Sequence, residues 1–402
     1  MLPSRRASFG AFALVLACSF AGADACSSSQ AESNTHEPGA AAGSGADAAS
    51  AGAHASLGGA NASGASVDGA SAGGASSGGV SSAGEASSSA GSDNGSEAGA
   101  SGSPSNGVRR IFYLDVQGSV LAFDEHETTP RTLVRSAGRG PDGIAVDVAS
   151  GHLFWTTMGV PADNDGSLRR SELDGSQVTT IVAAGLTYTP KQLKLDVAGQ
   201  KLYWSDREGM RIQRAAVDGS ALETLVTVAS GESARKDARN WCVGLALDLV
   251  HGFIYWTQKG PDNGMLGSIR RAHLQLPEGE TDSTRTDIEV LMAALPEPVD
   301  LDLDVLGGAM YWSDRGDDTI NRAAIEIPNG QTAASRDDRE VLVRGVREAI
   351  GVTLDLERGH VYYTSGASGR VGRANLDGSD AHDLLTGSGA LTGIAVVQLE
   401  DH

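Results

Sequence analysis

Cysteine is scarce in this chain of 402 residues, and two of the three cysteines, Cys18 and Cys26, lie near the N-terminus. Only Cys242 remains in the rest of the chain, so that part cannot form an intramolecular disulfide. Cys242 lies in an apolar segment, and we expect a buried free thiol. No His/Cys spacing typical of a metal site is present, so the sequence predicts neither a metal nor another cofactor.

Aromatic residues are almost absent from residues 1–107, where only Phe9, Phe12 and Phe20 occur. After a short apolar stretch this region is nearly all Ala, Gly and Ser. Such a segment cannot bury enough apolar surface to offset its loss of conformational entropy. We therefore predict a disordered linker over residues 26–107 and a folded domain over residues 108–402.

Long hydrophobic runs are also lacking. The apolar run Phe9–Phe20 follows Arg5 and Arg6 and is too short to span a bilayer comfortably, which predicts a signal peptide over residues 1–25. Val15–Cys18 resembles a bacterial lipobox, whose cysteine would be lipidated. Alternatively, Ala23–Ala25 fits ordinary signal peptidase cleavage before Cys26, which could itself be lipidated or leave a plain secreted protein. We expect an exported protein of the cell envelope or outer surface, otherwise secreted, that meets the membrane only through such an anchor.

Basic residues are fewer than acidic residues in both parts of the chain. Residues 1–107 carry 8 acids and 2 bases, and residues 108–402 carry 43 acids and 29 bases. The second part therefore contributes 29 − 43 = −14 to the formal net charge of −20. An acidic surface argues against nucleic acid and against anionic membrane as partners.

What the chain does contain is a short aromatic strand in six copies. Their first residues are 42, 49, 52, 56 and 51 positions apart, the period of four-stranded propeller blades. The copies are Phe112–Asp115, Phe154–Thr157, Tyr203–Asp206, Tyr255–Gln258, Tyr311–Asp314 and Tyr362–Ser365.

Other residues repeat in register with this strand. An Asp precedes five copies by seven residues, and an Arg ends the following strand in five copies. Three copies then contain an Asp-Gly-Ser turn, whose glycine supplies the positive φ of a tight hairpin. The Asp residues are Asp147, Asp196, Asp248, Asp304 and Asp355, and the Arg residues are Arg170, Arg214, Arg271, Arg322 and Arg373.

Together these three motifs resemble the LDL-receptor class B, or YWTD, repeat over residues 108–398. The resemblance implies an all-β, six-bladed β-propeller, here preceded by the signal of a bacterial secreted protein or lipoprotein. Two departures are that the motif's Asp is absent at Thr157, Gln258 and Ser365, and that Ala122 replaces the Arg of the first copy.

Ring closure can also be predicted. The first copy lacks a strand before Arg110, whereas Leu391–Val397 at the other end matches Pro141–Asp147. We expect the C-terminal strand to pair with the N-terminal strand and complete the first blade, which protects edges that an open ring would expose.

Two matched insertions, Gly159–Gly166 and Gly260–Gly267, flank the third blade. Their Asp163, Asp165, Asp262 and Asn263 offer oxygen ligands above Asp206, Arg207 and Glu208. Alternatively, the insertions are surface turns that bind no ligand, since Asp, Asn, Gly and Pro are ordinary turn residues. Calcium is not indicated, because Asp163–Gly166 lacks the EF-hand spacing and its closing Glu.

The innermost strands of two copies carry unusual polar residues, Lys194 in the third and Asp300 and Asp302 in the fifth. These could form a structural ion pair across the channel or bind a polar ligand.

Two functions remain open. We favour a non-enzymatic, monomeric binding module for an extracellular or envelope protein or glycan. The alternative is a metal-dependent hydrolase of the lactonase type, which needs several acids at the channel mouth. Of the aligned mouth positions, Asp142, Lys191, Val243, Val299, Ile350 and Thr392, only the first is acidic.

Overall fold

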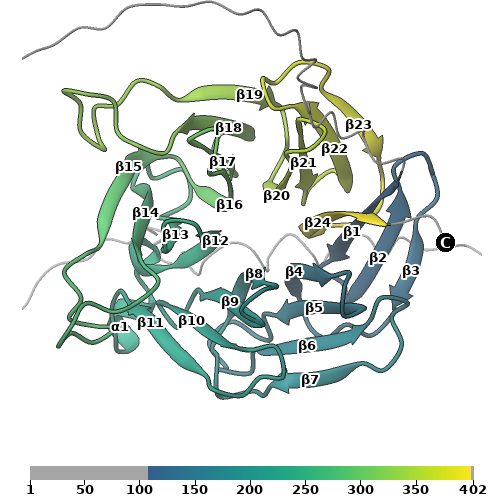
Figure 1. Cartoon of the computed structure of the whole chain (residues 1–402), viewed down its shortest axis with the longest axis horizontal. Helices are drawn as coiled ribbons and strands as arrows, with labels where there is room; N and C mark the ends of the chain where they lie inside the picture. Colours follow the sequence, from purple (N-terminus) through teal and green to yellow (C-terminus); the bar gives the residue numbers. More distant parts are fainter. Residues whose placement is uncertain (1–106, 400–402) are drawn as a thin grey trace, which may run out of the picture. The chain divides into compact units, whose positions relative to one another are not determined.

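The computed structural model describes residues 107–399, which form 24 β-strands in six four-stranded antiparallel sheets (Figure 1). The sheets are arranged as blades around a central channel, and this confirms the predicted six-bladed propeller. The predicted signal peptide and most of the linker lie outside the described residues. Within residues 107–399, no helix has the length and apolar character needed to cross a membrane.

In each blade the strands are named in order from the channel outward. Blade 1 contains β24 (Leu391–Leu399), β1 (Val108–Asp115), β2 (Ser119–Asp124) and β3 (Arg131–Val134); blade 2 contains β4 (Pro141–Asp147), β5 (His152–Thr157), β6 (Ser167–Glu172) and β7 (Thr179–Val182). Blade 3 contains β8 (Pro190–Asp196), β9 (Lys201–Asp206), β10 (Arg211–Ala216) and β11 (Glu223–Thr227); blade 4 contains β12 (Cys242–Asp248), β13 (Phe253–Gln258), β14 (Gly267–His273) and β15 (Glu289–Leu295). Blade 5 contains β16 (Pro298–Asp304), β17 (Ala309–Asp314), β18 (Thr319–Ala324) and β19 (Glu340–Arg344); blade 6 contains β20 (Ala349–Asp355), β21 (His360–Ser365), β22 (Arg370–Asn375) and β23 (His382–Leu385). A short helix α1 (Glu232–Arg235) and a 3-10 turn (Ala238–Asn240) lie between blades 3 and 4.

Blade 1 closes the ring as predicted. Strand β24 pairs antiparallel with β1, and Tyr113 lies opposite Ile394 in the register. The buried Arg109 on β1 then reaches blade 6, where its Nε donates to Asp355 at 2.6 Å. The first and last described strands therefore share one sheet and are joined to the neighbouring blade.

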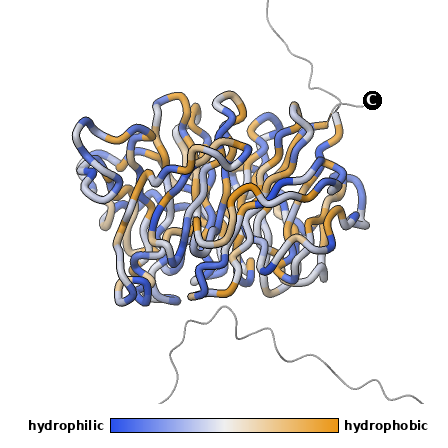
Figure 2. The backbone as a smooth tube through the Cα atoms, turned by 90° about the horizontal axis from the view of Figure 1, so that it is seen from below, coloured by the Kyte–Doolittle hydropathy of each residue, from blue (hydrophilic) through white to orange (hydrophobic). Residues whose placement is uncertain are grey.

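Aromatic and aliphatic side chains fill the spaces between neighbouring blades. The four tryptophans of the aromatic strands, Trp155, Trp204, Trp256 and Trp312, are completely buried. One cluster joins Phe154 and Leu168 of blade 2 to Trp204 of blade 3. Figure 2 shows hydrophobic segments running through the body of the propeller between its two faces. The second strand of each blade is buried on both sides, which explains why its residues do not alternate strictly between apolar and polar.

The third residue of the aromatic strand links adjacent blades through its hydroxyl group. In five blades this hydroxyl donates to a backbone carbonyl at the start of the next blade's innermost strand. In four of them it also accepts from a backbone N–H of its own innermost strand. The donors and acceptors are Thr156 to Lys191, Ser205 to Val243, Thr257 to Val299, Ser313 to Ile350 and Thr364 to Thr392.

Blade 1 has Leu114 at this position, and a different hydroxyl makes the sixth link. Thr392 of β24 donates its own Oγ1 to the carbonyl of Pro141 in blade 2, at 2.8 Å. Every pair of neighbouring blades is therefore joined near the channel by one buried side-chain hydroxyl.

These links hold the innermost strands very close together. A Cβ atom at Gly244 would lie 2.2 Å from the carbonyl oxygen of Val299, and one at Gly393 would lie 2.1 Å from that of Asp142. Real Cβ atoms do not approach so closely, so glycine is required where one blade's backbone passes the next.

A second set of contacts joins the blades farther from the channel. The repeated Arg of the third strand reaches the following blade in four cases: Arg214 to the carbonyl of Leu274, Arg271 to Glu326, Arg322 to the carbonyl of Leu376 and Arg373 to Glu125. The carboxylate of the repeated Asp accepts a backbone N–H three residues later and closes the turn, and Asp355 in addition accepts from Arg109 of the next blade.

Removal of β24 should abolish the fold. A chain ending at Ala390 loses the innermost strand of blade 1 and leaves two blade interfaces open, so we expect no cooperative melting transition by circular dichroism. A chain ending at Leu399 is the control and should melt like the full chain. An unchanged transition in the shorter chain would refute this account of closure.

The hydroxyl link predicts a cost for an isosteric substitution. Thr257→Val keeps the side-chain volume but leaves Gly244 N–H and the Val299 carbonyl without their partner. Burying such unsatisfied groups costs about 1–3 kcal/mol each, so we expect chemical denaturation to show a loss in this range or above. Thr179→Val, on an exposed outer strand, should change the free energy of unfolding by much less.

Candidate functional site

The two faces of the propeller differ. One face carries the loops that precede the innermost strands and those that follow the aromatic strands; we call it the loop face. The opposite face carries the turns closed by the repeated Asp, and we call it the turn face. Both matched insertions, residues 159–166 and 260–267, lie on the loop face.

The channel mouth on the loop face is closed by side chains. All six aligned mouth residues are buried, and three of them, Val243, Val299 and Ile350, form one apolar cluster. The acidic member, Asp142, is fully buried and lies 2.5 Å from Lys191 Nζ. Burial lowers the pKa of Lys191, and Asp142 acts against this shift. The mouth thus consists of three apolar residues, one ion pair and Thr392.

A ring of equivalent positions surrounds this mouth. In each blade, the residue after the four-residue aromatic motif donates its backbone N–H to the loop before the innermost strand. Three successive blades place a cation there, Arg207, Lys259 and Arg315, whereas the other three place Met158, Gly366 and Val116. The fold requires only the backbone at this position, so the three cations are a feature of this chain.

These three cations contact the aromatic ring of Trp241 and the buried carboxylate of Glu297. Arg207 Cζ lies 4.9 Å and Lys259 Nζ 5.4 Å from the ring centroid of Trp241. Lys259 Nζ also lies 2.8 Å from Glu297 Oε1, and Arg315 pairs with the same carboxylate. Cations over an aromatic face, and paired around a desolvated carboxylate, form a preorganised polar surface.

Two further acids complete this group. Asp262 Oδ1 lies 2.5 Å from Lys259 Nζ and 3.0 Å from Arg315 Nη2. Burial alone would raise the pKa of Asp262, but these two cations hold it below its usual value. The pKa of Glu208 is likewise lowered against burial, by Arg207 and Lys191. We call Arg207, Glu208, Trp241, Lys259, Asp262, Glu297 and Arg315 the loop-face strip.

The segment 231–241 lies between the two inserted loops. The guanidinium of Arg235 stacks 3.9 Å from the ring of Tyr188, whose hydroxyl donates to the carbonyl of Ala162 at 2.6 Å. Arg235 also donates to the carbonyl of Glu208, and Gly260 N–H donates to the carbonyl of Ala238 at 3.2 Å. A chain of contacts therefore links the two loops, and residues 235–241 take part in it.

The residues predicted to form a site around the inserted loops lie in different environments in the structure. Asp206 is fully buried, and its carboxylate accepts from Tyr188 N–H, Thr189 N–H and Arg211 Nε, which is a structural role. Asp165 closes its own loop by accepting from Val160 N–H at 2.6 Å, while Asp163 is exposed. Arg207, Glu208 and Asp262 belong to the loop-face strip. Asn263 lies beside blade 5, where a Cβ at Gly316 would be 2.9 Å from its Oδ1.

The channel residues form the expected ion pair. Lys194 Nζ of blade 3 lies 3.5 Å from Asp302 Oδ1 of blade 5. Asp300 and Asp302 also accept backbone N–H groups of β20 in blade 6, so they tie two blades together. Burial raises the pKa of Asp300 to about 7, although Lys194 opposes the shift. The pKa of Lys194 is raised because Asp302 and Asp300 outweigh its burial.

Trp241 and Glu297 were not expected from the sequence. A signal for their neighbours was present, since a cation follows the motif in three successive copies. Trp241 itself has no counterpart in the other blades, because it belongs to the connection between blades 3 and 4.

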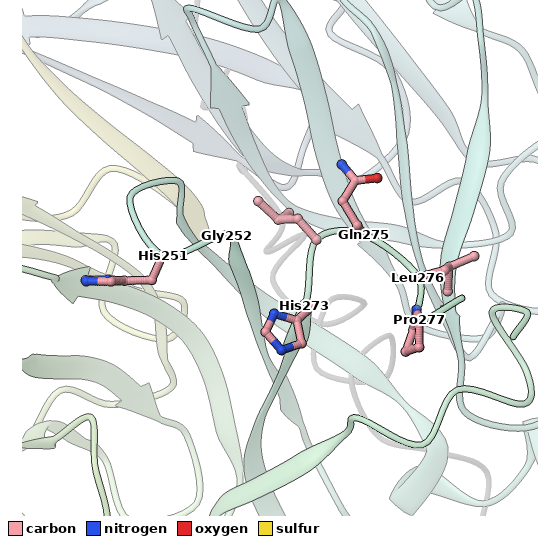
Figure 3. A pocket seen from close by; sticks show the side chains of 7 residues that line it. His251, Gly252, His273, Gln275, Leu276 and Pro277 are labelled. Carbon is pink, nitrogen blue, oxygen red and sulfur yellow. The ribbon is translucent and has the colours of Figure 1, made fainter. Parts of the chain in front are cut away.

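A separate surface pocket of about 510 Å³ lies on blade 4, beside the turn at His251 and Gly252 and the segment His273–Pro277. Figure 3 shows that its labelled side chains point apart rather than toward one position. In the described part of the chain, no three His, Cys, Asp or Glu side chains are grouped so that they could hold a metal.

The fold and the repeated contacts define a six-bladed β-propeller of the YWTD-repeat class. A protein of Pyricularia oryzae named low-density lipoprotein receptor-related protein 1 is 39% identical over 307 residues, which cover 72% of this chain and 98% of that protein. The chain therefore belongs to the LDL-receptor class B, or YWTD-repeat, propeller family. No family model matches the chain.

Two further comparisons concern a second relative in sequence and a solved structure. A 3-hydroxyacyl-CoA dehydrogenase-like protein LAM1 of Cochliobolus heterostrophus is 37% identical over 309 residues, covering 71% of this chain and 64% of that protein. This chain thus spans less than two thirds of that relative. A chain in the crystal structure of a nidogen/laminin complex has a TM-score of 0.55 and 22% identity, covering 72% of this chain and 98% of that chain.

Asp314, the residue before Arg315, should make the stability of the fold depend on pH. Asp314 is fully buried; its Oδ1 accepts Glu297 N–H and Gly316 N–H, but its Oδ2 has no partner. Burial and nearby Asp317 raise the pKa of Asp314 to about 7. The folded state therefore binds more protons than the unfolded state between about pH 4 and pH 7, and stability falls as pH rises, by at most about 1.4 kcal/mol per pH unit.

Asp314→Asn should remove this contribution, so its melting temperature should fall less than that of the wild type between pH 4.5 and pH 7.5. Asp163→Asn, on an exposed loop, should retain the wild-type slope. Parallel pH profiles for Asp314→Asn and the wild type would show that Asp314 is ionised throughout.

Proposed function

We propose that this protein is a non-enzymatic binding module whose ligand contacts the loop-face strip. One observation carries the proposal: three successive blades place a cation at the same position around Trp241 and Glu297, where the fold itself requires only backbone. The receptor-related name of the Pyricularia oryzae relative supports a binding role.

A protein ligand suits this surface better than a glycan. Three large apolar side chains on the loop face, Leu186, Met265 and Leu266, are each at least half exposed. Interfaces between proteins combine such apolar groups with aromatic and arginine anchors, as Trp241 and Arg207 would provide. The acidic net charge of the domain makes nucleic acid an unsuitable ligand.

We further propose that the domain acts outside the cytoplasm. The signal-like N-terminus, with Cys18 or Cys26 as lipidation candidate, and the Ala/Gly/Ser-rich linker support this location. A flexible linker of roughly 80 residues would reach on the order of 50 Å from its anchor. This distance would let a membrane-anchored propeller meet ligands beyond the surface that holds it.

The lactonase alternative gains no support from the channel mouth. Its acid, Asp142, is buried and paired with Lys191, and the neighbouring mouth positions Val243, Val299 and Ile350 offer no oxygen ligands from their side chains.

Substitutions in the loop-face strip and in the adjoining inserted loop should greatly reduce ligand capture. We would perform proximity labelling with the full-length protein on intact cells that produce it, comparing wild type with Trp241→Ala and with Asp262→Ala/Met265→Ser/Leu266→Ser. We expect at least a tenfold loss of specifically labelled ligand, as for truncation of an interface hot spot, with a cooperative melting transition retained in each variant.

The matched control is Leu306→Ser, which replaces the most exposed aliphatic side chain of the turn face and should leave capture unchanged. If the strip variants label the same set as the wild type, the ligand does not bind there. Deletion of residues 159–166 tests the other inserted loop in the same assay.

A further inference from the structure

Three arginines gather on the loop face where blade 1 meets blade 2, away from the loop-face strip. Arg135 and Arg139 lie in the connection between β3 and β4, and Arg169 lies on β6. Arg135 and Arg139 are exposed, and within residues 107–399 neither guanidinium forms an ion pair or a hydrogen bond. Arg169 has a single long contact, from Nη1 to the carbonyl of Ser136 at 3.4 Å, and its buried Nε has no partner.

The backbone of the loop that carries Arg135 and Arg139 is held by hydrogen bonds to neighbouring segments. Ala137 N–H donates to the carbonyl of Gly118 at 2.8 Å, and the Trp155 indole donates to the carbonyl of Ala137 at 2.7 Å. The carbonyl of Arg139 accepts Gly159 N–H at 3.1 Å. The backbone is therefore held on both sides of Gly138, while the arginine side chains remain free.

Gly138 provides the space for Arg169. Its φ is +109°, and a Cβ there would lie 3.1 Å from Arg169 Cζ and 2.6 Å from Thr157 Cγ2. Only glycine allows this conformation and leaves room for the guanidinium beside the loop. The Arg169 group is thus seated next to the backbone that carries the other two arginines.

No carboxylate within residues 107–399 forms an ion pair with this cluster. Asp142 pairs with Lys191 instead, while Asp165 and Asp115 accept backbone N–H groups. Elsewhere on the same face, Arg211 has Asp206 and Arg315 has Glu297 as acidic partners, whereas the exposed Arg344 and Arg347 have none among the described residues. Although residues 108–402 carry a net charge of 29 − 43 = −14, the three arginines at the boundary of blades 1 and 2 therefore keep a local excess of positive charge.

We propose that Arg135, Arg139 and Arg169 bind sulfate or carboxylate groups of a polyanionic polysaccharide. Guanidinium groups offer paired N–H donors that match such oxyanions bidentately. The loop between them presents Ser136, Gly138 and Gly140 and no exposed apolar anchor, so it lacks the hot-spot side chains that a peptide partner would need. A hydrophilic, repeating anion requires no such anchor.

The test measures binding of the full chain to a heparin oligosaccharide, with fluorescence anisotropy at several salt concentrations. We expect the wild type to bind, with affinity falling steeply as salt rises, because exposed charges are screened. Arg135→Gln/Arg139→Gln should weaken binding at least about tenfold, and adding Arg169→Gln should weaken it further. The double variant changes only exposed side chains, so its fold should be retained.

Controls separate this cluster from the remaining charges. Arg344→Gln/Arg347→Gln removes two other exposed arginines, at the boundary of blades 5 and 6, where the neighbouring Arg370 is paired with Asp383, and should leave affinity unchanged. Trp241→Ala should also bind heparin normally, which distinguishes this site from the loop-face strip.

The proposal would be overturned by no binding by the wild type, by equal binding by the double variant, or by equal affinity for polyglutamate of matched length. The last result would assign the cluster to acidic peptides. Stabilisation by inorganic sulfate without any binding of the oligosaccharide would likewise overturn it, because the cluster would then hold only a free ion.

Discussion

The hydroxyl group on the third residue of five of the six aromatic strands makes the contact on which the architecture depends. In five blades it donates to a carbonyl of the next blade's innermost strand, and Thr392 makes the sixth link. A hydroxyl reaches only a short distance, so neighbouring strands must approach until glycine alone fits at positions such as Gly244. The same closeness narrows the channel mouth and buries all six of its side chains. Function is therefore displaced from the mouth to the loops around it.

The ring around that mouth shows how a repeated fold leaves positions free to vary. Each blade needs the backbone N–H after its aromatic motif, but not the side chain. Three consecutive blades use this freedom for Arg207, Lys259 and Arg315, and buried Glu297 compensates part of their charge. The last position of the aromatic motif, in contrast, needs a polar side chain. In two of the three blades that lack the Asp, Gln258 and Ser365 donate to the carbonyls of Arg239 and Arg347, so another polar group holds the same loop.

The sequence predicted what each repeat determines locally. The aromatic strands, the turns closed by the repeated Asp and the pairing of β24 with β1 all follow from residues at fixed spacing. The hydroxyl links were not predicted, because a donor in one blade meets its acceptor about 40 residues later only once the ring has formed. The site was predicted less well for the same reason. Arg207, Glu208 and Asp262 were expected near the inserted loops, but Trp241 belongs to a connection without a repeated counterpart, and its contacts arise only from folding.

Charge distribution extends this argument to the whole loop face. In blades 3 to 5 the cations are matched by Glu208, Asp262 and Glu297, so that surface is polar but nearly neutral. At the boundary of blades 1 and 2, Arg135 and Arg139 lack such partners although acids outnumber bases in the domain. A matched network suits a partner that buries it, since desolvated charges need compensation. Unmatched surface cations instead suit a solvated anion that supplies the missing charge. The two regions therefore differ in the chemistry of the partner that each can accept, although both rest on loops held by the same ring of backbone hydrogen bonds.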